Sequence, residues 1–227
     1  MSADTLPVRI RDAATTIVVR SDGPVPRVLM GQRGKTAAFM PEKFVFPGGA
    51  VDPSDGDVPF ATPLEPQVAA RLSHDSEERL ILALAGAAIR ELWEETGLAL
   101  GRHGTWTGEV PEDWADFAAA GLLPAAGALD FVFRAITPDG RPRRFDARFF
   151  LVDAAELVGD LDDFSRACDE LSELQWIPLP ETRSFNLPFV TEVVLGEISR
   201  AVREGGRPAS VPFFDNRTAR SVFSRIG

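Results

Sequence analysis

Three glutamates on one predicted helix could together hold a divalent metal ion. The stretch RELWEETG places Glu91, Glu94 and Glu95 at spacings of three and four residues, which makes their side chains neighbours on a helix surface. Carboxylates gathered in this way repel one another, and burial raises the cost unless a cation is present. Their oxygens suit hard cations such as Mg²⁺ or Mn²⁺. A solvated Glu-rich helix face is the commoner explanation of such a cluster taken alone.

A second stretch, FPGGAVDPSD, lies about forty residues earlier in the chain. The apolar run 44–46 predicts a short strand, and the Pro-Gly-Gly sequence at 47–49 predicts a turn after it. Bare glycine backbone in a turn can approach a metal or phosphate closely. Asp52 and Asp55 follow directly. Pro-Gly-Gly alone is most often only a loop, but the order of strand, glycines, acids and carboxylate helix favours a functional site.

The carboxylate helix is predicted by its apolar periodicity. Leucine, isoleucine and alanine recur at spacings of three and four from position 80 to position 92. Asp75 or Ser76 is a candidate N-cap, and Gly97 stands where a left-handed residue ends a helix.

The other expected elements mix strands with helices. The pair 13–20 and 27–33 predicts a hairpin, and residues 52–76 look like a loop. Further strands are expected at 128–136, 143–154 and 171–179, and further helices at 111–123 and 187–205. This mixture predicts an α/β or α+β protein, with a mixed sheet flanked by helices.

Composition excludes several classes of function. The 227 residues carry a net charge of −10, which argues against general binding to nucleic acid. No apolar run is long enough to predict a membrane span, and no signal peptide is recognised. A single cysteine excludes an internal disulfide and fits a cytoplasmic location. No linker stretch is found, so we expect one domain over residues 1–227.

The two stretches together resemble the signature of the Nudix hydrolases. Gly49 matches its first glycine, and Arg90, Glu91, Glu94, Glu95, Gly97 and Leu98 match its second half without a fault. Two departures stand out. Asp55 replaces a glutamate, and 34 residues separate Asp55 from Arg90 where the pattern has seven. The extra residues form an insertion at about 56–82, where a surface excursion costs little loop-closure entropy.

The resemblance implies the Nudix fold and hydrolysis of a diphosphate bond in a small molecule of the nucleoside diphosphate type. The interrupted signature and its flanks are similar to a branch that includes peroxisomal coenzyme A diphosphatases, which points to coenzyme A or its acyl derivatives. Alternatives are NADH, ADP-ribose or a nucleotide sugar, or a Nudix-like module that binds a ligand without catalysis. The intact carboxylates favour an enzyme over such a module. The assembly is left open between a monomer and a homodimer.

The resemblance also assigns roles to single residues. Glu91, Glu94 and Glu95, with the carbonyl of Gly48, are the expected ligands of Mg²⁺ or Mn²⁺. Arg90 is expected to orient the carboxylates, itself held by Asp52 or Asp55. The general base is a glutamate of the helix, such as Glu94, or the later Glu170, which lies six residues before Trp176. A plain surface acid explains Glu170 equally well.

The insertion has two interpretations. Residues 57–74 are either a lid or rim over the substrate pocket, or a segment that only packs against the sheet.

Overall fold

The structure is a computed structural model that describes residues 8–35, 40–205, 208–218 and 220–227. Its main sheet has nine strands, with seven in the order β11-β10-β7-β8-β1-β2-β3, while β4 pairs with β1 and β9 with β2. These strands are β1 (Ile10–Arg20), β2 (Arg27–Arg33), β3 (Phe44–Val45), β4 (Gly48–Ala50), β7 (Asp130–Ile136), β8 (Arg144–Asp153), β9 (Leu171–Pro178), β10 (Val211–Asp215) and β11 (Val222–Ile226). The sheet is mixed, because β1 runs parallel to β8 and antiparallel to β2 and β4.

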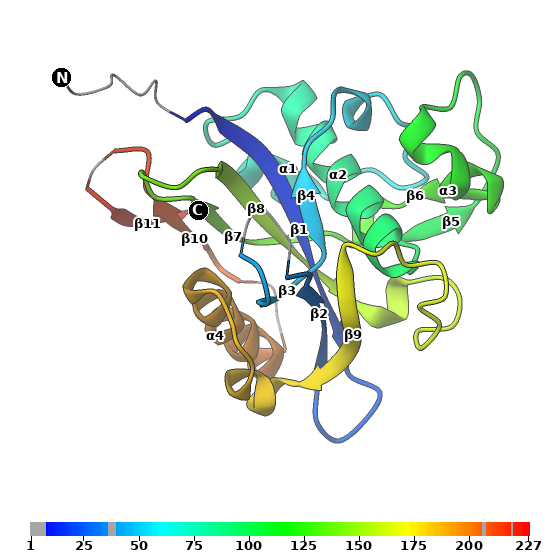
Figure 1. The fold of residues 1–227 in the computed structure, drawn as a ribbon. Helices are drawn as coiled ribbons and strands as arrows, with labels where there is room; N and C mark the ends of the chain where they lie inside the picture. Colours follow the sequence, from blue (N-terminus) through cyan, green and yellow to red (C-terminus); the bar gives the residue numbers. More distant parts are fainter. Residues whose placement is uncertain (1–7, 36–39, 206–207, 219) are drawn as a thin grey trace.

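Helices cover both faces of this sheet. They are α1 (Pro66–Leu72), α2 (Glu78–Thr96), α3 (Ala115–Ala119) and α4 (Phe189–Glu204). The helix α2 packs on one face beside a two-stranded sheet of β5 (Gly101–His103) and β6 (Leu122–Pro124), and α4 packs on the other face (Figure 1). This architecture confirms the predicted α+β fold with a mixed sheet between helices.

Alternation along β1 builds the two cores. Ala14 and Val18 face the core that contains α2, while Ile17 belongs to the core that contains α4. Thr16 lies between Ala14 and Val18 on β1, and its hydroxyl donates a hydrogen bond of 2.7 Å to the carbonyl of Ala88 in the middle of α2. This bond ties the carboxylate helix directly to the central strand.

The predicted Pro-Gly-Gly turn is wrong. Gly48 and Gly49 belong to β4, whose residues pair with Thr15 and Ala14 of β1, and Gly48 is extended at a φ of 159°. The chain leaves β3 and pairs with β1 along the same edge as β2, because β8 occupies the opposite edge. The glycines are needed for close packing, because a Cβ on Gly48 would overlap the Ala14 carbonyl.

The predicted start of α2 is also wrong, whereas its end is confirmed. The N-cap residue is Glu77. The Ser76 hydroxyl instead accepts a hydrogen bond of 3.0 Å from Arg148, and Asp75 has a positive φ of 56°. Gly97 ends the helix in the left-handed conformation at a φ of 75°, as the sequence predicts.

The insertion is less loop-like than predicted and contributes to the core. It follows the 3-10 helix η1 (Pro53–Gly56) and contains α1, and its last residues, 78–82, already belong to α2. Val58, Val68 and Leu72 are exposed by only 6%, 3% and 1% and join the same core as α2. This burial favours the packing interpretation over the lid.

Two other differences concern short elements. The helix expected at 111–123 is divided into the 3-10 helix η2 (Glu112–Trp114), α3 and β6, because Gly121 turns the chain at a φ of 72°. The last two strands, β10 and β11, are not predicted from the sequence, and β11 forms the edge of the sheet.

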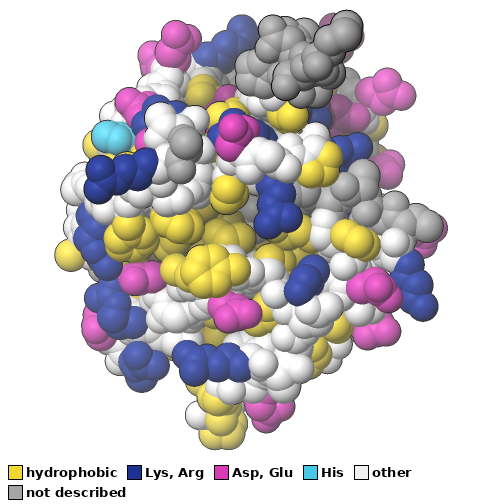
Figure 2. Space-filling model, turned by 60° about the vertical axis from the view of Figure 1, so that its left-hand side comes forward, with side chains coloured by type: hydrophobic (Ala, Val, Ile, Leu, Met, Phe, Trp, Pro, Cys, Tyr) yellow, Lys and Arg dark blue, Asp and Glu magenta, His cyan; other side chains and the backbone are white. Residues whose placement is uncertain are grey.

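The face that carries β10, β11 and α4 exposes hydrophobic side chains among charged ones (Figure 2). Phe189 of α4 and Phe223 of β11 are 69% and 55% exposed. Within the described part of the chain, none of the helices is both long and apolar enough to span a bilayer.

Candidate functional site

Arg90 lies at the centre of the site and is only 4% exposed. Its Nε and one terminal nitrogen donate hydrogen bonds of 2.9 and 3.0 Å to the two oxygens of Asp55, which is completely buried. Its other terminal nitrogen donates to Glu91 at 2.8 Å and to Glu94 at 3.1 Å. Asp52 lies 3.5 Å from the guanidinium. Arg90 therefore joins η1 to two of the three helix carboxylates, and Asp55 is its principal partner.

Backbone close packing places the other carboxylates. The amide of Gly48 donates a hydrogen bond of 2.7 Å to Oε2 of Glu95. The carboxylate of Glu91 lies directly on Gly49, and a Cβ at that position would overlap it. Gly86 of α2 allows η1 to approach the helix closely, since a Cβ at that position would overlap the carbonyl of Asp55. Gly49 and Gly86 thus allow β4 and η1 to lie against one side of α2.

Burial makes these carboxylates poor acids. Desolvation raises the pKa of Glu91 to about 7, although Arg90 partly offsets this effect. The pKa of Glu95 is raised well above its usual value by burial and by the charge of Glu91, against a smaller opposing effect of the Gly48 amide. The more exposed Glu94 has its pKa raised by burial, with Arg90 opposing. Such shifts are typical of sites that bind a cation or move protons.

The donor set fits a hard divalent cation. Glu95 is 2% exposed, and its Oε1 has no hydrogen-bond partner among the described residues. The hydrogen bonds from Arg90 use one oxygen each of Glu91 and Glu94. Within the described residues, no three His, Cys, Asp or Glu side chains converge in a ready-made metal site. Glu91, Glu94 and Glu95 are the residues that would hold such a cation.

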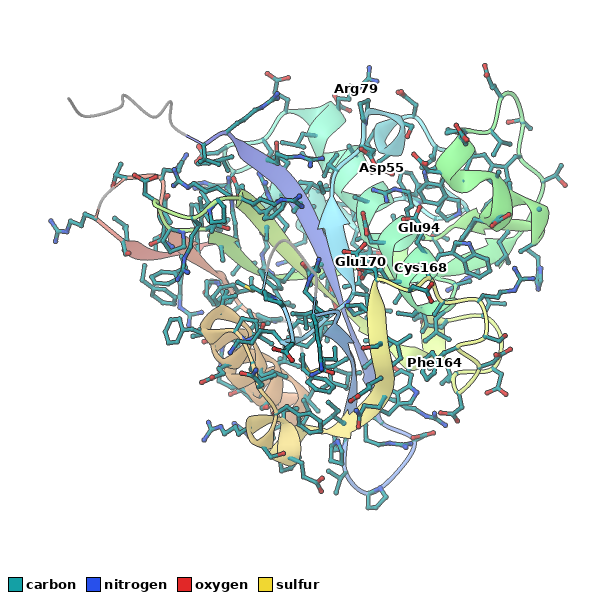
Figure 3. The ribbon with its side chains drawn as sticks, in the orientation of Figure 1. Asp55, Arg79, Glu94, Phe164, Cys168 and Glu170 are labelled. Carbon is teal, nitrogen blue, oxygen red and sulfur yellow. The ribbon has the colours of Figure 1, made fainter. Side chains whose placement is uncertain are left out.

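Glu170 lies at the same end of α2, next to the start of β9 (Figure 3). It is half-exposed, forms an ion pair of 2.8 Å with Arg33, and its charge raises the pKa of both Glu91 and Glu95. The neighbouring loop is fixed by the amide of Cys168, which donates a hydrogen bond of 2.9 Å to the carbonyl of Glu94. The structure therefore brings Glu170 near the carboxylate cluster, and its role as general base stays a prediction.

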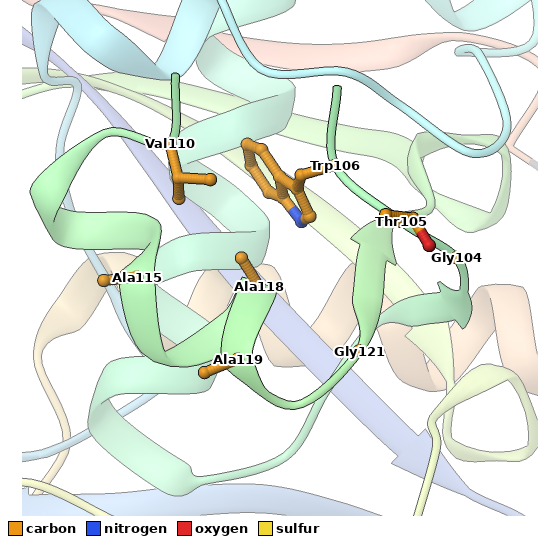
Figure 4. Close-up of a pocket in the computed structure, with 8 residues that line it drawn as sticks. All are labelled: Gly104, Thr105, Trp106, Val110, Ala115, Ala118, Ala119 and Gly121. Carbon is orange, nitrogen blue, oxygen red and sulfur yellow. The ribbon is translucent and has the colours of Figure 1, made fainter. Parts of the chain in front are cut away.

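An apolar hollow of about 460 Å³ lies beside α3 (Figure 4). The indole of Trp106 forms one wall and is fixed by a hydrogen bond of 2.7 Å to the carbonyl of Leu122. The other lining residues are small or aliphatic: Gly104, Thr105, Val110, Ala115, Ala118, Ala119 and Gly121. None of these groups titrates, so the hollow supplies no acid or base.

Sequence reasoning missed two groups of the site. Arg33, the last residue of β2, holds Glu170, and this contact depends on the antiparallel pairing of β2 with β9. The second group is the amide of Gly48, because the sequence suggested its carbonyl. A glycine pair before an acidic run signals close approach but does not say which backbone atom is used.

Comparison with known proteins shows the family. No family model matches the chain. The curated protein "Putative nudix hydrolase 7" of Caenorhabditis elegans is 33% identical over 164 residues, which cover 66% of this chain and 46% of that protein. The chain thus matches less than half the length of this relative. The crystal structure of a NUDIX hydrolase from Alicyclobacillus acidocaldarius is 30% identical, with coverage of 83% of this chain and 90% of that one and a TM-score of 0.61. The chain belongs to the Nudix hydrolase family.

Proposed function

We propose that the protein is a divalent-metal-dependent diphosphatase that hydrolyses the diphosphate bond of a small molecule of the nucleoside diphosphate type. One observation carries the proposal. Glu95 is buried beside Glu91, and one of its oxygens has no partner among the described residues. Glu91 is paired with Arg90, but the buried Glu95 has no ion pair among the described residues, and a bound Mg²⁺ or Mn²⁺ would remove the cost of its charge.

The chain's own residues divide the work. Glu91, Glu94 and Glu95 would hold the ion, and the carbonyl of Gly48 is a further proposed ligand. When bound, the ion supplies neutralisation of diphosphate charge and a lowered pKa for a water molecule. Arg90 orients two carboxylates through its bonds at 2.8 and 3.1 Å. The Gly48 amide fixes the third at 2.7 Å.

Glu170 is the proposed general base. It is half-exposed, so water reaches it, and its charge acts on the carboxylate cluster. Arg33 holds one of its oxygens, which leaves the second to accept a proton from the attacking water. Glu94 is the second candidate, because it is the most exposed of the three helix carboxylates. Glu170→Gln and Glu94→Gln separate the two: the variant of the base should lose the acidic limb of the pH profile of kcat.

Coenzyme A or an acyl derivative is the proposed substrate. Water would add across the diphosphate, giving a phosphopantetheine and an adenosine bisphosphate. Support comes from the interrupted signature and its flanks, which resemble coenzyme A diphosphatases. NADH, ADP-ribose and a nucleotide sugar remain the alternatives. Cytoplasmic location and a homodimer stay predictions.

The test is a panel of these four substrates with Mg²⁺, with Mn²⁺ and with EDTA, with products separated by chromatography. We expect turnover of at least one substrate with a metal and none with EDTA. Glu95→Gln removes charge from the proposed metal site, and we expect it to reduce kcat by about a hundredfold or more while circular dichroism stays unchanged. Near-normal turnover of this variant at saturating Mg²⁺ contradicts the metal assignment. Strong preference for another member of the panel contradicts only the coenzyme A proposal.

A further inference from the structure

A second, larger hollow of about 860 Å³ lies at the opposite end of α2 from the carboxylates. It is formed where the first residues of β1 meet η1, the first turns of α2 and the turn before β8. Ala83 lines it, and Glu94 follows eleven residues later on the same helix. At a rise of about 1.5 Å per residue, the two sites are roughly 16 Å apart along the helix.

A surplus of positive charge distinguishes this hollow, although Arg79 pairs with Asp57 at 2.8 Å and Arg144 with Asp139 at 3.3 Å. Arg9, Arg11, Arg79, Arg143 and Arg144 all line it, in a chain whose net charge is −10. Arg9, Arg11 and Arg143 are exposed. Their guanidinium groups have no hydrogen bond or ion pair with any residue that the structure describes. Arginine in this state is the side chain best suited to bind phosphate, because its donors form a planar fork.

The acids of the hollow do not cancel this charge. Asp12 forms an ion pair of 2.5 Å with Arg148, and Asp52 lies 3.5 Å from Arg90. Both of these arginines lie outside the lining of the hollow. Glu77 is the remaining acid. A surplus of guanidinium groups therefore faces the space.

The rest of the lining is apolar. Ile10, Val51 and Leu80 are partly buried and pack against the core beneath. Phosphate-binding groups at the rim of an apolar floor match a ligand with a charged end and a flat, weakly polar ring. We propose that this hollow binds a nucleoside phosphate, with its phosphate on Arg9, Arg11 and Arg143 and its base on the apolar floor.

The hollow also connects to the catalytic end of the helix. Asp52 lines it, approaches Arg90, and donates its amide to Asp55 Oδ2 at 2.8 Å. A phosphate bound in the hollow would repel the carboxylate of Asp52 and alter its contact with Arg90. Two ligands could present this nucleotide group to the hollow. One is a free nucleotide, and the other is the nucleotide end of a long substrate.

Binding of AMP to the metal-free protein in EDTA tests the site without any need for activity, because AMP contains no diphosphate bond. We expect saturable binding by calorimetry, and at least tenfold weaker binding of adenosine, which lacks the phosphate. Arg143→Ala should weaken AMP binding by about tenfold or more. Arg141→Ala is the matched control, because Arg141 is exposed in the same turn and does not line the hollow. Glu95→Gln should leave AMP binding unchanged.

Three results would overturn the proposal: no saturable binding at millimolar AMP, equal affinities of the Arg143 and Arg141 variants, or loss of binding in Glu95→Gln. Kinetics with the best substrate then identify the source. A competitive effect of AMP on KM, with KM raised by the same factor in Arg143→Ala, assigns the nucleotide to the substrate. An effect on kcat assigns it to a free effector. Unchanged constants at saturating AMP would refute the connection through Asp52.

Discussion

Replacing Asp55 with asparagine tests how far one buried ion pair holds the site together. Asp55 is completely buried and accepts three hydrogen bonds, at 2.9 and 3.0 Å from Arg90 and at 2.8 Å from the amide of Asp52. Asparagine keeps the shape but presents an amide donor where one of these donors must be accepted. Arg90 would then be a buried cation that has lost its bidentate partner.

The expected cost follows from this burial. Removing one partner of a buried pair typically destabilises a protein by about 3–5 kcal/mol. Arg90 keeps Glu91 and Glu94, so we expect the lower end, about 3 kcal/mol. For a chain of this length that corresponds to a fall in Tm of roughly 6–12 °C, measured by circular dichroism and checked by urea unfolding. Turnover should fall as well, because Arg90 orients two carboxylates.

Asp57→Asn is the control for this experiment. Asp57 forms an ion pair of 2.8 Å with Arg79, again joining the loop to α2, but the two side chains are 59% and 69% exposed. Exposed pairs contribute about 0–1 kcal/mol, so this variant should melt within a few degrees of the parent. Equal losses in the two variants, or a loss below about 1 kcal/mol for Asp55→Asn, would show that burial does not set the strength of the Arg90 pair.

Three further predictions concern the carboxylates, the glycines and the insertion. Because the pKa of Glu91 is raised to about 7 from a usual 4.5, the folded metal-free protein binds the extra proton between these values, so its free energy of unfolding should fall as pH rises from 5 to 8. Urea unfolding in EDTA should show this loss, up to roughly 3 kcal/mol, and added Mg²⁺ should reduce it; a rise with pH would contradict it. Gly49→Ala should lower both Mg²⁺ affinity and turnover, because its methyl group would overlap the Glu91 carboxylate, whereas Gly196→Ala has open space and should be neutral. Leu72→Ala should cost about 2–5 kcal/mol in unfolding titrations if the insertion belongs to the core, and Leu82→Ala, at a residue 38% exposed, should cost much less.

The helix that carries the carboxylates could be predicted closely from the sequence, and its surroundings could not. Apolar periodicity and Gly97 located α2 and its end, because both depend on residues near one another in the chain. The start of α2 could not be predicted, because it depends on a long-range contact. The Ser76 hydroxyl accepts a hydrogen bond from Arg148 of β8 and does not cap the helix. The same reason explains the glycines of β4, which read as a turn until their pairing with β1 is known.

The sequence by itself determined which charged residues of the candidate site are neighbours. The spacing of Arg90, Glu91, Glu94 and Glu95 is set by one helix, so their neighbourhood needs no knowledge of the rest of the chain. Only the tertiary structure decided what faces them. That Asp55 and not Asp52 chiefly pairs with Arg90, that the Gly48 amide fixes Glu95, and that Arg33 holds Glu170 all depend on segments brought together across 35 to 137 positions. Such contacts follow from strand pairing and from burial of the two cores, which no local pattern of residue types encodes.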